Sequence, residues 1–126
     1  MIYDLTIMKT GGFNKTDVEN IVSRVAKFAV KMPSLNNDNS VWLQVDNIDI
    51  KDNFELFTYI AESSINNVLI LRVQEKETMS ICVEFYYENG QMMAHREIEK
   101  NKEGTAFVYK PFYVNGMDVH KFEAGI

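Results

Sequence analysis

The chain has little of several residue types on which recognisable sites are built. Its 126 residues include one cysteine, two histidines and two prolines. The single cysteine, Cys82, excludes an internal disulfide and a metal site built on several cysteines. No apolar run approaches the roughly 20 residues that a membrane-spanning helix needs. Residues 1–10 contain Asp4 and lack a cationic start, so we expect a cytoplasmic protein without a secretory signal.

Motifs of the common enzyme classes are also missing. There is no phosphate-binding P-loop, no G-x-G-x-x-G, no G-x-S-x-G and no H-E-x-x-H. Asp46, Asp49 and Asp52 resemble a calcium loop only superficially, because the glycine and the final glutamate of an EF-hand are absent. We therefore expect neither a cofactor nor a bound metal, and the sequence favours a non-catalytic role.

Charge and composition indicate one acidic globular domain, residues 1–126. The chain has 18 acidic and 13 basic residues, a net charge of -5, and 46% of its residues are apolar. That apolar share is enough for a single core at this length. The negative balance argues against nucleic acid as a partner, because binding to phosphates needs a positive surface.

The order of the predicted elements indicates an α+β fold. Strands and helices alternate twice, and a meander of four strands with a possible short final strand follows. We expect a curved antiparallel sheet of five or six strands with two helices packed on one face, in the order β-α-β-α-β-β-β-β. The predicted strands span residues 2–9, 41–48, 68–73, the hairpin 79–100, 105–114 and 117–122, and the helices span residues 14–32 and 52–64.

The first predicted helix has a clear start and stop. Apolar residues recur at helical spacing through residues 14–32, and Pro33 ends the pattern. Either Asn14 caps the helix, or Thr16 caps it in a capping box with Glu19.

The second predicted helix, residues 52–64, begins with a similar signal. Asp52 and Glu55 have the spacing with which two side chains cap free backbone amides. Four residues form its predicted apolar stripe: Phe54, Phe57, Ile60 and Ala61.

The hairpin is the clearest local signal, because Asn89-Gly90 accepts positive φ at both turn positions. A regular two-residue turn fixes the register of the two strands. The predicted pairs are Tyr87 with Met92, Phe85 with Ala94, Glu84 with His95, and Val83 with Arg96. One face is then apolar, and the other carries Ser80, Cys82, Glu84, Tyr86, Met93, His95, Glu97 and Glu99.

The open sheet face, with the polar side of the hairpin, and its rim give the predicted contact surface. Acidic side chains there would meet a protein partner with a basic surface, and aromatic and methionine side chains would anchor it. The predicted binding residues are Trp42, Asp46, Glu84, Tyr86, Met93, His95, Glu97 and Glu99. We expect a protein-binding module that blocks its partner sterically, such as an inhibitor, a toxin-immunity protein or a phage-borne antagonist of a host system. The sequence is also compatible with a homodimer formed through an edge strand.

The alternative is a ligand-binding or hydrolytic pocket domain. Glu84 opposite His95 would give an acid-base pair, since a carboxylate can orient an imidazole and raise its pKa. A metal site that also uses His120 is conceivable. Cys82 is a poor nucleophile candidate, because it lies within a strand near acidic residues.

A basic stripe is predicted on the solvent side of the first helix. Arg24, Lys27 and Lys31 recur at helical spacing. Basic residues near a helix C-terminus stabilise its dipole, and a small phosphate or nucleic-acid contact is the alternative.

Overall fold

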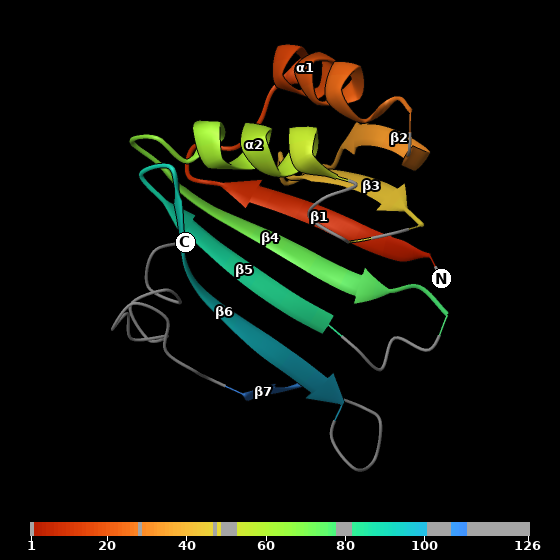
Figure 1. Ribbon diagram of the computed structural model, residues 1–126, viewed down its shortest axis with the longest axis vertical. Coiled ribbons are helices and arrows are strands. Elements are labelled where there is room, and N and C mark those ends of the chain that lie inside the picture. Colours follow the sequence, from red (N-terminus) through yellow and green to blue (C-terminus); the bar gives the residue numbers. More distant parts are fainter. Residues whose placement is uncertain are drawn as a thin grey trace.

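The computed structural model of the chain describes residues 2–27, 29–46, 48, 53–77, 82–100 and 107–110. For residues 82, 96–100 and 107–110 it describes the backbone alone. One antiparallel sheet carries both helices on the same face (Figure 1). The predicted α+β class and the one-sided placement of the helices are confirmed. The predicted final strand, residues 117–122, lies outside the described residues.

The sheet has seven strands in the order β2-β3-β1-β4-β5-β6-β7, and every neighbouring pair is antiparallel. The units β1-α1-β2 and β3-α2-β4 are interleaved, which is the split β-α-β arrangement called ferredoxin-like. Many unrelated functions occur on that arrangement, so it assigns none here. The elements are β1 (Tyr3–Lys9), α1 (Lys15–Val25), β2 (Ala29–Leu35), β3 (Val41–Val45), α2 (Phe54–Ser63), β4 (Val68–Glu75), β5 (Cys82–Glu88), β6 (Gln91–Lys100) and β7 (Phe107–Lys110).

Asn14 caps α1, which confirms one of the two predicted starts. Its side chain accepts a hydrogen bond from the Asp17 amide, and the Asp17 carboxylate accepts one from the Asn14 amide, both at 2.9 Å. The capping box is therefore formed with Asp17 and not by Thr16. Ile21 and Val25 are fully buried one helical turn apart, and each contributes roughly 1.5–3 kcal/mol of hydrophobic stabilisation.

The predicted extent of this helix, residues 14–32, is wrong. The helix ends at Val25, and Ala29–Leu35 forms the additional strand β2 at the edge of the sheet. Pro33 disfavours helical geometry at Met32 and cannot donate a backbone hydrogen bond. The segment instead pairs with β3, with two register shifts along its length.

The second helix is shorter than predicted, and Phe54 is the one residue of its predicted apolar stripe that does not pack on the core. It begins after Asn53, whose side chain makes no capping hydrogen bond, and the predicted cap Asp52 lies outside the described residues. Phe54 is exposed, because it lies about 200° around the helix from Leu56. The buried residues of α2 are Leu56, Tyr59 and Ile60.

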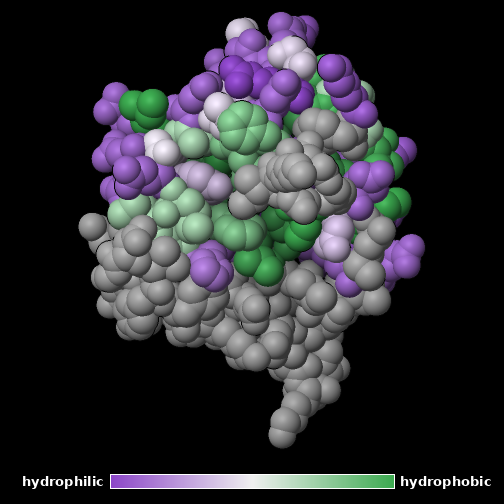
Figure 2. Space-filling model, viewed as in Figure 1, coloured by the Kyte–Doolittle hydropathy of each residue, from purple (hydrophilic) through white to green (hydrophobic). Residues whose placement is uncertain are grey.

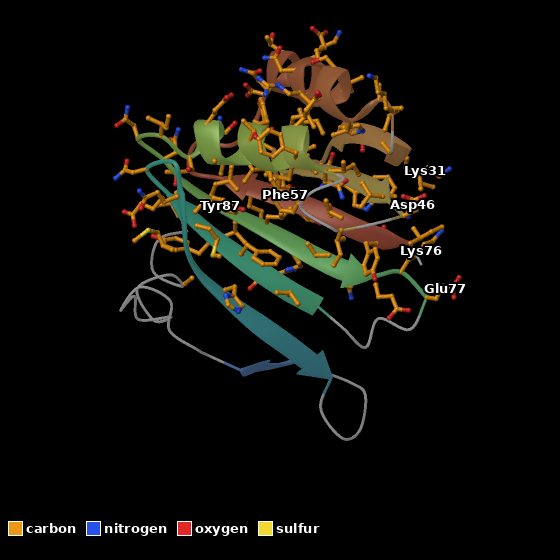
Figure 3. All side chains as sticks on the ribbon, viewed as in Figure 1. Lys31, Asp46, Phe57, Lys76, Glu77 and Tyr87 are labelled. Atoms are coloured by element: carbon orange, nitrogen blue, oxygen red, sulfur yellow. The ribbon has the colours of Figure 1, made fainter. Side chains whose placement is uncertain are left out.

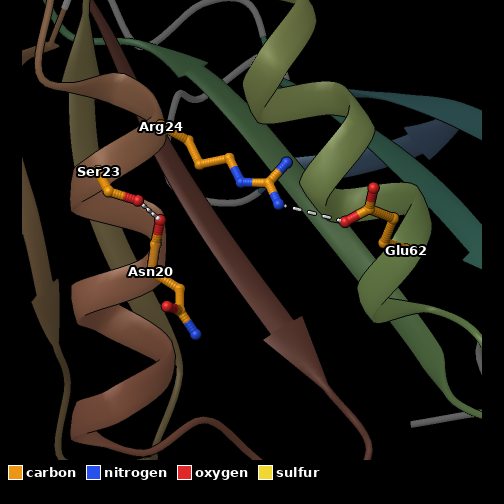
Figure 4. A network of polar contacts seen from close by, with 4 residues as sticks. All are labelled: Asn20, Ser23, Arg24 and Glu62. Atoms are coloured by element: carbon orange, nitrogen blue, oxygen red, sulfur yellow. Dashed lines mark hydrogen bonds and ion pairs between the residues drawn. The ribbon is translucent and has the colours of Figure 1, made fainter.

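A polar contact joins the two helices on their outer side (Figure 4). Arg24 of α1 forms a salt bridge with Glu62 of α2 at 3.4 Å. The guanidinium of Arg24 also lies over the ring of Tyr59, 5.5 Å from its centroid. Both charged side chains are partly exposed, so the pair adds little to stability.

The main core lies between the helices and the sheet. Alternate residues of β1, β3 and β4 face the helices, among them Leu5, Leu43 and Leu71. A smaller cluster lies on the helix-free face, where Ile70, Tyr86 and Ala94 are buried. The predicted strand at residues 68–73 is confirmed as β4, which contributes buried residues to both faces.

The Asn89-Gly90 turn is confirmed and is attached to the end of α2. Asn89 and Gly90 both have positive φ, 51° and 83°. The Gly90 amide donates a hydrogen bond to the Ser64 hydroxyl at 2.8 Å, and the Asn89 amide donates to the Ser64 carbonyl at 2.9 Å. The hairpin tip is thereby held against the helical layer.

The hairpin register is as predicted at the turn and wrong beyond it. Tyr87 pairs with Met92, but Tyr86 pairs with Ala94, so Met93 is an extra residue in β6. Met93 and Ala94 both pack on the small helix-free cluster, which regular alternation along a strand forbids. From this β-bulge onward Phe85 pairs with His95, Glu84 with Arg96, and Val83 with Glu97.

Two adjacent glycines after β1 give a prediction about close packing. Gly11 and Gly12 both have positive φ, but only a Cβ at Gly12 would meet the Asn39 Cβ, at 2.8 Å. Gly11→Ala should lower the free energy of unfolding by about 1–2 kcal/mol through backbone strain. Gly12→Ala should cost a further 1–3 kcal/mol or so from the steric overlap. Urea denaturation of both variants checks this, and equal losses would contradict the close approach.

Candidate functional site

Glu84, the central residue of the predicted contact surface, is not available to a partner. It is 1% exposed and lies on the helix-free face of β5. The Arg72 Nε and Nη2 atoms both donate hydrogen bonds to Glu84 Oε2, at 2.8 and 2.6 Å. Register pairing places Thr6, Arg72 and Glu84 in one row across β1, β4 and β5. The carboxylate therefore has an internal structural role.

Tyr86, a predicted anchor, is 2% exposed beside this row. Its hydroxyl donates a hydrogen bond to Glu88 Oε2 at 3.0 Å. Burial raises the pKa of Tyr86 to about 12, and the hydrogen bond to Glu88 and its negative charge add to the shift. A buried phenol with a satisfied hydroxyl offers no contact area to a partner.

Trp42 is also turned towards internal partners. Its indole Nε1 donates to Asp4 Oδ1 at 3.2 Å, and Gln44 Nε2 donates to the same oxygen at 2.8 Å. The Oε1 atom of Gln44 is buried and makes no hydrogen bond. Trp42 and Gln44 therefore lie on one face of β3, and their hydrogen bonds to Asp4 engage the predicted anchor Trp42 within the sheet.

His95 lies on the opposite face from Glu84. It pairs with Phe85, and their ring centroids are 6.1 Å apart. Successive residues of a strand point to opposite faces, so the shifted register separates the two side chains. The predicted Glu84–His95 acid-base pair is therefore wrong. His120, the other histidine of the conceivable metal site, lies outside the described residues.

The remaining predicted binding residues do not restore the surface. Asp46 is exposed at the end of β3, and Met93 is partly buried in the helix-free cluster. The backbones of Glu97 and Glu99 pair with β7, and their side chains lie outside the description. Of the four predicted acidic contact residues, Asp46 alone has a described side chain that is exposed.

The structure shows a different exposed apolar surface along β2. Val30, Met32 and Leu35 are 44%, 46% and 42% exposed on this seven-residue edge strand. Hydrophobic side chains alternate with hydrophilic ones along the rim where Figure 1 places β2 (Figure 2). Sequence reasoning missed this surface because it assigned Val30 and Met32 to a helix that was expected to end before Leu35. Pro33 was the available signal, because a proline disfavours helical geometry at the residue before it and so indicates that the helix ends before Met32.

Two lysines flank these apolar residues. Lys27 lies in the connection between α1 and β2, and Lys31 lies within β2. Lys31 points away from the sheet (Figure 3). Neither lysine forms a salt bridge with another residue of the described ranges. We call Val30, Met32, Leu35, Lys27 and Lys31 together the β2 edge.

The described surface also has shallow hollows away from the predicted pair. One of about 420 Å³ lies between the helices and is lined by Ser23, Arg24, Phe54, Glu55 and Thr58. A second, of about 300 Å³, lies beside Gly11, Gly12 and the loop 36–40, and its lining includes Lys9 and Asp38. Neither hollow includes Glu84 or His95 in its lining.

In the part of the chain that the structure describes, neither helix has the length and apolar character needed to span a membrane. Among the same residues, no group of three or more histidine, cysteine, aspartate or glutamate side chains is arranged to hold a metal ion.

The ion pair of Arg72 with the buried Glu84 carboxylate should couple strongly in a double-mutant cycle. Arg72→Met leaves the Glu84 carboxylate buried without its guanidinium and should cost at least about 2 kcal/mol. The coupling energy with Glu84→Gln should be about 1–3 kcal/mol. The exposed pair Arg24→Met and Glu62→Gln is the control, with coupling below about 0.5 kcal/mol. Equal coupling in the two cycles, measured by urea unfolding, would contradict the internal role of Glu84.

Tyr86 should make stability fall at high pH. Its folded pKa of about 12 lies above the unfolded value near 10, so the folded state holds this proton more tightly. The stabilisation is complete below pH 10 and is lost as pH rises towards 12. Between these values wild type should lose up to about 2 kcal/mol more than Tyr86→Phe in the free energy of unfolding. Parallel pH profiles for the two proteins would exclude a raised pKa.

Comparisons with known proteins do not assign a function. No protein-family model matches the chain, and no curated protein or solved structure matches it either. The residues of the β2 edge and of the helix-free face are therefore the basis for any functional argument.

Proposed function

We propose that the chain is a non-catalytic protein-binding module that blocks a partner sterically through the β2 edge. The observation that supports this most is the exposure of three large apolar side chains on one edge strand. Soluble proteins normally cover or charge such strands, because exposed edges invite association. Methionine, moreover, is enriched at the contact surfaces of protein interfaces.

The helix-free face supports the same proposal because its polar groups are engaged within the protein. Its polar side chains are used within the protein, by Arg72 with Glu84 and by Tyr86 with Glu88. These groups stabilise the sheet and leave recognition to the exposed edge. The contact surface is therefore moved from the predicted sheet face to β2.

The strand β2 alone is too short to provide the whole interface. From Val30 to Leu35 a strand spans roughly 17 Å, which is shorter than the side of a typical protein interface. A stable interface buries about 800 Å² on each partner. The partner must then also contact neighbouring parts of the same side, namely the α1–β2 connection with Lys27 and the loop 36–40.

Affinity capture from the native host tests the proposal. The baits are wild type, Met32→Glu and the control Ile65→Glu. Ile65 is 54% exposed in the connection between α2 and β4, which lies on the opposite side of Figure 1 from β2. A protein captured by wild type and Ile65→Glu should bind Met32→Glu at least about tenfold more weakly. Thermal melting of all three baits checks that they are equally folded.

Two results would count against the proposal. If no protein is captured by wild type above a blank matrix, the binding function is wrong. If all three baits capture the same protein equally, the β2 edge is not the contact surface.

A further inference from the structure

The β2 edge has the opposite charge from the chain as a whole. The protein carries a net charge of -5, yet residues 20–35 contain three basic residues and no acidic one. Arg24 is already engaged with Glu62, so Lys27 and Lys31 are the charges left for a partner. The basic stripe predicted on one helix is thus divided between α1, its C-terminal connection and the edge strand.

The nearest acidic residue in the register forms no salt bridge with Lys31. Lys31 pairs with Gln44, and Asp46 follows Gln44 by two residues along the chain. Asp46 is exposed and forms no salt bridge with any residue of the described ranges. Within the described ranges, no carboxylate therefore forms a salt bridge with the positive charge beside Met32.

The backbone of β2 is poorly suited to pairing with a further strand. Two register shifts interrupt its ladder with β3, and Pro33 removes one amide donor. Bulges and proline on an edge strand are features that prevent strand addition. The exposed apolar side chains are thus presented to a partner's side chains and not to its backbone.

From these observations we infer that the partner presents acidic residues beside large apolar ones, and that it docks on the β2 edge by side-chain contacts. The inference rests on the proposed function and adds the chemistry of the partner. It reverses the partner with a basic surface expected from the sequence, since the acidic residue Glu84 is buried. Apolar contacts of Val30, Met32 and Leu35 would supply affinity, while Lys27 and Lys31 would select against cationic partners.

Selection from a random phage-displayed peptide library tests this chemistry. Peptides are selected on the full-length wild type and depleted on Met32→Glu, which leaves binders of the β2 edge. The recovered peptides should be enriched in aspartate and glutamate next to large apolar residues. Recovery of peptides rich in lysine and arginine, of peptides without a charge bias, or of none above background would overturn the inference.

A matched pair of charge reversals then tests the two lysines. The double variant Lys27→Glu/Lys31→Glu should weaken binding of a selected peptide by roughly tenfold, and higher salt should weaken wild-type binding. Lys15→Glu/Lys76→Glu has the same net charge but changes exposed lysines elsewhere, and it should bind like wild type. Equal binding by the two double variants would overturn the inference.

The captured host partner separates this inference from the proposed function. Suppose Met32→Glu loses that partner while Lys27→Glu/Lys31→Glu retains it in full. The β2 edge is then a protein-binding surface, as proposed, and the acidic character of the partner is wrong. If Met32→Glu also retains the partner, the β2 edge is not the contact surface, and the result contradicts the proposed function itself.

Discussion

A single extra residue in β6 decides how the second half of the sheet is built. Met93 interrupts the alternation of the strand, so Ala94 and His95 face the sides opposite to those that a regular hairpin gives them, and the later backbone pairs are shifted by one residue. The bulge places Ala94 on the helix-free cluster beside Tyr86 and turns His95 towards Phe85. The positions of Glu84 and His95 relative to each other depend on this one irregularity.

Polar side chains stabilise the helix-free face, and the β2 edge is the surface that we propose for recognition. On the helix-free face Arg72 holds the Glu84 carboxylate, and Asp4 accepts hydrogen bonds from two residues of β3. Burying a charge is costly unless its partner is retained, which makes that face a poor place for a variable contact surface. The β2 edge has no such constraint, because its side chains are exposed and its lysines form no described salt bridge.

Much of the fold follows from local signals in the sequence. The Asn14 cap, the Asn89-Gly90 turn and the buried strand at residues 68–73 are each encoded by neighbouring residues, and the structure confirms them. The failures depend on distant contacts. Residues 29–35 become a strand because β3 offers them an edge, and Met93 bulges because Tyr86 and Ile70 accept it in their cluster. Neither the secondary-structure propensity of a residue nor the two-residue alternation of a strand reports such distant contacts. The site derived from the regular hairpin register was therefore misplaced.

Measuring the register of the hairpin in solution is the most direct test of the β-bulge at Met93. Nuclear Overhauser contacts between backbone protons across β5 and β6 report each pair of opposed residues in solution. The account predicts contacts between Phe85 and His95 and between Glu84 and Arg96. Contacts between Glu84 and His95, together with Phe85 and Ala94, would show a regular hairpin without the bulge and would contradict it.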